Sequence, residues 1–72
     1  MMVKSQIVLY IYDELKTNKF ITISDIINKY SICERSFRRY VAEINAYFYN
    51  NFKNQVIKYD YYNKRYYLEN NS

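Results

Sequence analysis

Apolar residues recur at helical spacing in the first part of the chain. Ile7, Ile11 and Leu15 lie four residues apart, which predicts an amphipathic helix over about residues 4–17. The charged residues of this segment fall largely on the other side of that helix. Residues 20–21 follow as an apolar pair that is long enough for a stub of strand only.

A short second helix, about two turns long, is predicted next. Its apolar positions follow the i, i+3, i+4, i+7 pattern of one helix face: Ile23, Ile26, Ile27 and Tyr30. Thr22 with Asp25 three residues later matches a capping box at its start. Ile32 falls in the tight turn that follows, where we expect it to fill the gap between two helices.

A third and longer helix is predicted over about residues 34–49. Its apolar face consists of Phe37, Val41, Ile44 and Phe48. At about 100° per residue, Arg35 and Arg39 fall opposite this face. Arg38 lies on one flank and Ser36 on the other. The arginines are therefore expected to point away from the core, close to the start of the helix.

The C-terminal segment, about residues 55–69, is predicted to form a β-hairpin. Two runs rich in β-favouring residues flank a turn-like stretch at residues 60–63. The apolar residues expected to share a face within their strands are Ile57 with Tyr59, and Tyr66 with Leu68. The basic residues of the hairpin, expected on its outer face or near its tip, are Lys58, Lys64 and Arg65.

The length and composition indicate one small globular domain over residues 1–72. Half of the residues are hydrophobic and 25% are charged, which is unlike a disordered chain. The chain has no glycine, so turns with positive φ must use the next most tolerant residues. The asparagines placed for this role are Asn50, Asn51, Asn54 and Asn63.

Several classes of function are excluded by missing residues. The chain has no histidine and one cysteine, so it has neither an intrachain disulfide nor the usual ligands of a zinc site. No catalytic set or phosphate-binding loop is present, and we expect no enzyme activity, metal or cofactor. The single cysteine fits a reducing, cytoplasmic setting, and no stretch approaches a secretion signal or a membrane span. Cys33 is expected to be a small buried or half-buried residue.

The predicted elements together indicate a winged helix-turn-helix, a fold that is mainly α with a small β-hairpin. In a helix-turn-helix the second helix lies in the DNA major groove. Arginine suits this position because its planar fork pairs bidentately with guanine or phosphate, and Ala42 and Ala46 keep the outer face small. The candidate DNA-binding residues are Arg35, Ser36, Arg38 and Arg39 on the recognition helix, and Lys58, Lys64 and Arg65 on the wing. A net charge of +4 also favours a polyanionic partner.

The stretch "ITISDIINKYSICERSFRRYVAEI" resembles the DeoR-type winged helix-turn-helix, a domain also found in biotin-repressor ligases and in regulators with a WYL domain. Arg35, Ser36 and Arg39 take the places of the family's Arg-Thr-x-x-Arg, and "RYYLE" is similar to the last strand of the wing. The resemblance covers about residues 5–69 and implies a DNA-binding regulator. Cys33 stands where the family has a capping serine, and Arg38 where it has tyrosine.

The function expected from the sequence is sequence-specific binding of double-stranded DNA, in a bacterial or mobile-element transcription regulator. One recognition helix covers a half-site only, so a homodimer or a larger parent protein is implied. An alternative is a winged helix that binds proteins, and another is single-strand or RNA binding through the Tyr-rich wing. The arginines could also form an ordinary solvated face, and biased codon usage explains much of the tyrosine excess.

Overall fold

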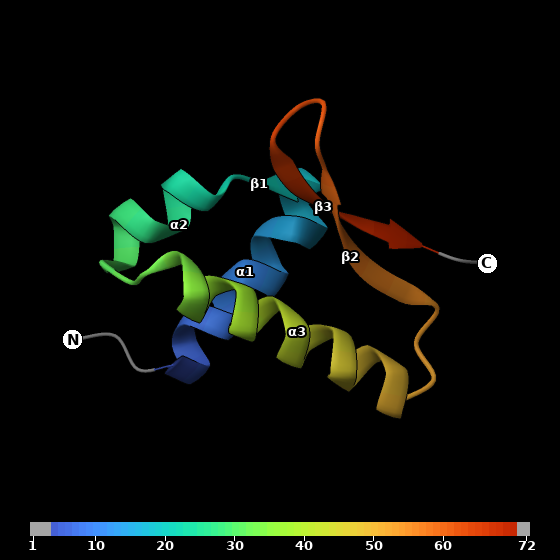
Figure 1. Ribbon diagram of the computed structural model, residues 1–72. Helices are drawn as coiled ribbons and strands as arrows, with labels where there is room; N and C mark the ends of the chain where they lie inside the picture. Colours follow the sequence, from blue (N-terminus) through green and yellow to red (C-terminus); the bar gives the residue numbers. More distant parts are fainter. Residues whose placement is uncertain (1–3, 71–72) are drawn as a thin grey trace.

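A computed structural model describes residues 4–70 of the chain, which form three helices and three strands. The elements are α1 (Lys4–Asn18), β1 (Phe20–Ile21), α2 (Ile23–Tyr30), α3 (Glu34–Asn50), β2 (Gln55–Asp60) and β3 (Arg65–Asn70) (Figure 1). The predicted order of elements and the mainly helical class with a β-hairpin are confirmed. The turn between β2 and β3 projects beyond the helices at the top of Figure 1.

The hairpin is extended into an antiparallel sheet of three strands within residues 4–70, in the order β1-β3-β2. The short β1 pairs with β3 through Phe20↔Tyr67 and Ile21↔Tyr66, and β2 pairs with β3 from Gln55↔Asn70 to Asp60↔Arg65. The central strand is therefore β3, and β2 is an edge strand. The predicted two-residue strand is present, and its pairing ties the segment before α2 to the β2–β3 hairpin.

The core is built from the apolar faces that the helical spacing predicts. Its buried side chains are Ile7, Ile11 and Leu15 of α1, Ile21 of β1, Ile26 of α2, Phe37, Val41, Ile44 and Phe48 of α3, and Ile57 of β2. Tyr66 and Leu68 of β3 are partly buried and pack against this core. Because all four predicted positions of α3 are buried, the helical phase used to orient the arginines is correct.

The N-terminal junction of α2 follows the predicted capping chemistry, and its C-terminal junction is closed by Ser31. The Thr22 hydroxyl accepts a hydrogen bond from the backbone N–H of Asp25 at 3.3 Å, as expected of a capping residue. Ser31 ends the helix in the left-handed region, and its N–H donates to the carbonyl of Ile27 at 2.8 Å. Ile32 is partly buried against the core, which confirms its place in the turn.

The prediction that asparagines take the positive-φ positions is wrong. None of Asn50, Asn51, Asn54 and Asn63 has a positive φ, and the residues that do are Lys19, Ser31, Phe52 and Lys64. Two asparagines instead use their side-chain amides as donors: Asn51 Nδ2 to the Tyr47 carbonyl at 2.9 Å, and Asn63 Nδ2 to Asp60 Oδ2 at 2.7 Å. In two turns the residue with positive φ therefore directly follows an asparagine: Phe52 follows Asn51, and Lys64 follows Asn63. Each asparagine supplies a side-chain hydrogen bond to its turn.

Candidate nucleic-acid interface

The outer face of α3 carries two exposed arginines one turn apart. Arg35 and Arg39 lie on the side opposite the buried Phe37, and neither forms an ion pair within residues 4–70. Ala42 and Ala46 continue this face toward the C-terminus and are also exposed. The outer face of α3 therefore carries two unpaired guanidinium groups near its start and only the small side chains of Ala42 and Ala46 further along.

Cys33 and Ser36 interact at the N-terminus of α3. The prediction of a buried or half-buried Cys33 is wrong, because the residue is exposed at the N-cap position, where the short connection leaves it outside the core. Its Sγ lies 3.3 Å from Ser36 Oγ, and the thiol makes no capping hydrogen bond. The hydrogen bond with the Ser36 hydroxyl is the main cause of a lowered pKa at Cys33. Ser36 is half-buried, and its hydroxyl is engaged with the thiol rather than free beside the arginines.

Arg38 lies on the flank of α3 that faces the hairpin. Its guanidinium is 3.3 Å from the carboxylate of Glu34, one turn earlier, and both side chains are about half exposed or more, at 64% and 52%. An exposed i,i+4 pair contributes only about 0.3–0.5 kcal/mol, so Arg38 can exchange this partner for another anion at small cost. The two residues line a cleft with Ile23, Tyr59, Tyr61 and Tyr66, between α3 and the hairpin.

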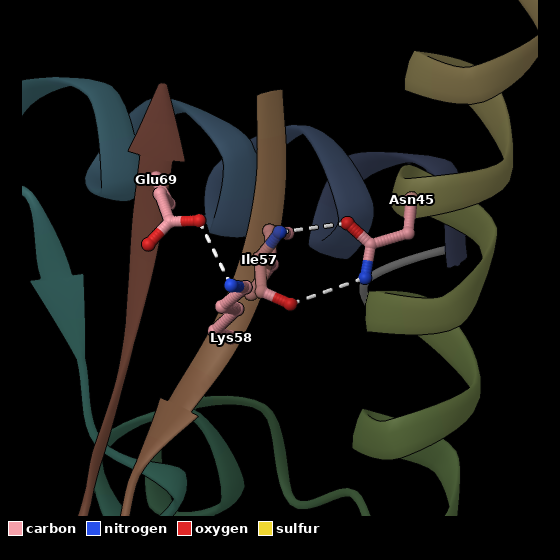
Figure 2. Close-up of polar contacts among 4 residues, drawn as sticks. All are labelled: Asn45, Ile57, Lys58 and Glu69. Carbon is pink, nitrogen blue, oxygen red and sulfur yellow. Dashed lines mark hydrogen bonds and ion pairs between the residues drawn. The ribbon is translucent and has the colours of Figure 1, made fainter. Parts of the chain in front are cut away.

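The three basic residues of the hairpin have different surroundings. Lys58 lies mid-strand on the outer face of the sheet, with its Nζ 2.9 Å from Glu69 Oε2, and this hydrogen bond raises the pKa of Lys58 (Figure 2). Arg65 is half-buried, with its guanidinium 4.1 Å from the centre of the Phe20 ring. Lys64 is exposed in the turn and forms no ion pair within the described residues 4–70. Lys64 is thus the basic residue of the hairpin that is free at the tip.

Asn45 of α3 holds the edge strand β2 in place. Its Oδ1 accepts a hydrogen bond from the Ile57 N–H at 2.8 Å, and its Nδ2 donates to the Ile57 carbonyl at 3.2 Å (Figure 2). The side-chain amide therefore satisfies backbone groups that the edge of the sheet leaves unpaired. Sequence reasoning missed this residue. The signal was a polar side chain at the border of the apolar face of α3, between Val41 and Phe48.

The turn of the hairpin is closed by the carboxylate of Asp60. Asp60 Oδ1 accepts from the backbone N–H groups of Tyr62 at 3.0 Å and Asn63 at 3.2 Å, and Oδ2 accepts from Asn63 Nδ2 at 2.7 Å. The hydrogen bond from the Asn63 side chain is the main cause of a lowered pKa at Asp60. Because these contacts span the turn, a chain without glycine still forms a defined tip.

Within residues 4–70 there is no group of three or more potential metal-ligating side chains, and no helix has the length and apolar character of a membrane span. Comparisons of the chain with protein-family models, with curated proteins and with solved structures give no match. The candidate interface therefore rests on the geometry of this chain alone. Helix α3 presents Arg35 and Arg39, the hairpin presents Lys64, and Arg38 lies between them.

Proposed function

We propose that this chain is a winged helix-turn-helix domain that binds double-stranded DNA sequence-specifically, as the DNA-binding part of a transcription regulator of the DeoR-type class. The observation that carries the proposal is the pair Arg35 and Arg39. Both are exposed, both lie opposite the core on α3, and neither has an anionic partner within residues 4–70. A helix that displays free guanidinium groups beside small alanines suits a major groove.

The basic residues divide between base and backbone contacts. Arg35 and Arg39 are the base-reading candidates, because a guanidinium that is free in solution can pair bidentately with guanine. Arg38 lines the cleft between α3 and the hairpin, Lys64 is exposed in the hairpin turn, and both suit the phosphate backbone. Lys58 must leave Glu69 before it can contact a phosphate, and it therefore has a secondary place in the interface.

A single copy of α3 covers one half-site, so specific binding requires a homodimer or a larger parent protein. A groove between α1 and α3 lies beside the exposed Leu9 (65% exposed) and Tyr47 (54% exposed). None of the residues that line this groove belongs to the outer arginine face of α3. Assembly through this groove would leave Arg35 and Arg39 free for DNA.

Selection of bound sequences from a random duplex pool tests the function. A sequence-specific domain enriches a common motif, and Arg39→Ala relaxes the preference at one position while the domain stays folded. Lys16→Ala is the matched control, because Lys16 is an exposed cation at the end of α1 and outside the proposed interface. A pool that shows no enrichment, or the same motif with equal affinity after Arg39→Ala, would count against the proposal.

Single-strand binding is the second candidate, because two tyrosines at the hairpin turn are almost fully exposed. Tyr61 is 84% exposed and Tyr62 is 93% exposed. Exposed aromatic rings next to cations are the side chains on which unpaired bases stack. Competition between a selected duplex and each of its single strands separates the candidates, since a duplex-binding protein is displaced efficiently only by the duplex.

A further inference from the structure

The tip of the hairpin exposes two aromatic rings that have different surroundings. The ring of Tyr61 lies edge-on against Tyr59, with centroids 4.7 Å apart and an interplanar angle of 85°. Tyr62 is 93% exposed, and within residues 4–70 no aromatic ring or cation contacts its ring. One ring is therefore packed at its base, and the other is presented to solvent.

A continuous series of rings joins the tip to the centre of the core. Tyr61 contacts Tyr59, Tyr59 contacts Tyr66 at 4.8 Å, and Tyr66 contacts Phe37 at 5.1 Å. Phe37 is fully buried in the first turns of α3, between the two exposed arginines in sequence. Aromatic pairs of this geometry contribute beyond their buried area, so the tip is held in a fixed position relative to the outer face of α3.

The backbone of the turn is fixed from the other side by Asp60. Its carboxylate accepts the N–H of Tyr62 itself and two further hydrogen bonds from Asn63. The turn is thus ordered before any partner arrives, which reduces the entropy that is lost on binding. The Asp60 carboxylate is also occupied by these bonds, and the exposed cation of the turn is Lys64.

We propose that Tyr62 is a DNA-contacting side chain, which lies against the sugars and base edges of the duplex beside the groove that receives α3. This inference rests on the proposed function. The positioning residues are Tyr59, Tyr61 and Tyr66, whose ring contacts fix the position of the hairpin turn relative to α3. Duplex DNA fits better than an acidic protein surface because Tyr62 shares the hairpin turn with the exposed cation Lys64, and because its neighbour Tyr61 lines a cleft together with Arg38.

A fluorescent reporter tests the contact directly, because the chain has no tryptophan. Tyr62→Trp introduces a single indole at the tip, and Phe52→Trp is the matched control, since Phe52 is equally exposed at 93% but lies beyond the C-terminal end of α3. The probe is a duplex enriched from a random pool. On addition of this duplex, the Tyr62→Trp emission changes and its quenching by acrylamide falls, while the Phe52→Trp emission stays constant.

Affinity measurements with the same duplex give a second readout. Tyr62→Ser weakens binding about five-fold or more, the lower end of the range for an aromatic side chain on nucleic acid, and Phe52→Ser leaves binding unchanged. Thermal melting confirms that both variants are folded. Duplex binding that is equal in the wild type and Tyr62→Ser, with a silent reporter, overturns this inference and leaves the proposed function standing. A reporter that responds only to single strands also overturns it, and a wild-type chain that binds no duplex overturns both proposals.

Discussion

Replacing Asn45 with alanine tests how the hairpin is held against α3. The substitution removes both hydrogen bonds to Ile57 and leaves its N–H and carbonyl without partners at a partly buried edge. An unsatisfied buried polar group costs about 1–3 kcal/mol of folding stability. Because the N–H and the carbonyl of Ile57 both keep partial access to water, we expect a combined loss of about 2 kcal/mol. A domain of this size loses about 4–8 °C in melting temperature per kcal/mol, so we expect a loss of roughly 8–16 °C.

The matched control for this prediction is Asn51→Ala. Asn51 also donates its side-chain amide to a backbone carbonyl, that of Tyr47 at 2.9 Å, but this contact is exposed to solvent. Its loss is expected to change stability by no more than about 0.5 kcal/mol. Thermal and urea unfolding followed by circular dichroism measure both variants. Equal losses for Asn45→Ala and Asn51→Ala would refute the reasoning.

Amide hydrogen exchange tests whether the loss of stability arises at the backbone N–H of Ile57. The amide of Ile57 faces α3 rather than β3, and its protection in the wild type depends on Asn45 Oδ1. Asn45→Ala is expected to accelerate exchange at Ile57. Asn45→Asp keeps the acceptor and loses the donor, so the Ile57 N–H stays protected while stability still falls. Fast exchange at Ile57 in the wild type would contradict the assignment.

Three further predictions concern the core, the start of α3 and the α1 surface. Phe37→Ala removes a fully buried ring and is expected to lower stability by about 3–5 kcal/mol, measured by urea unfolding; a normally stable variant would contradict this. Cys33→Ser supplies a hydroxyl at an N-cap that lacks a side-chain hydrogen bond. We expect this variant to be more stable by about 1 kcal/mol, measured as a higher melting temperature. The hydrogen bond to Glu14 Oε1 raises the pKa of Tyr10 from 10.0 to about 12. The stability of the wild type should therefore fall as the pH rises from 10 through 12. Melting curves at alkaline pH should show no such loss for Tyr10→Phe.

The fold could be predicted largely from the spacing of apolar residues, because burial imposes a period on each helix. The faces of α1 and α3 follow this rule, and the buried Phe37 fixes the outward direction of Arg35 and Arg39. Long-range register could not be predicted in the same way. The pairing of β1 with β3 places Phe20 beside Arg65, a contact that depends on two segments far apart in sequence.

The surroundings of the candidate site residues were harder to predict than their positions. The Asn45–Ile57 bonds depend on which edge of the sheet packs against α3, and no local pattern specifies this. The partners Glu34 and Glu69 similarly decide which cations are free, although Glu34 lies one helical turn before Arg38 and could have been recognised by that spacing. A basic residue in a sequence is therefore only a candidate DNA contact until the structure shows whether an acidic side chain already pairs with it.

The central claim is tested most directly by measuring duplex affinity over a series of salt concentrations, for the wild type and for the double variant Arg35→Ala, Arg39→Ala. If one domain neutralises about four phosphates, log affinity falls with log salt with a slope near −4, from about 0.9 per phosphate. The double variant is expected to lose sequence preference and most of its affinity while remaining folded. A slope near zero, equal binding by the double variant, or a preference for single strands would contradict the account.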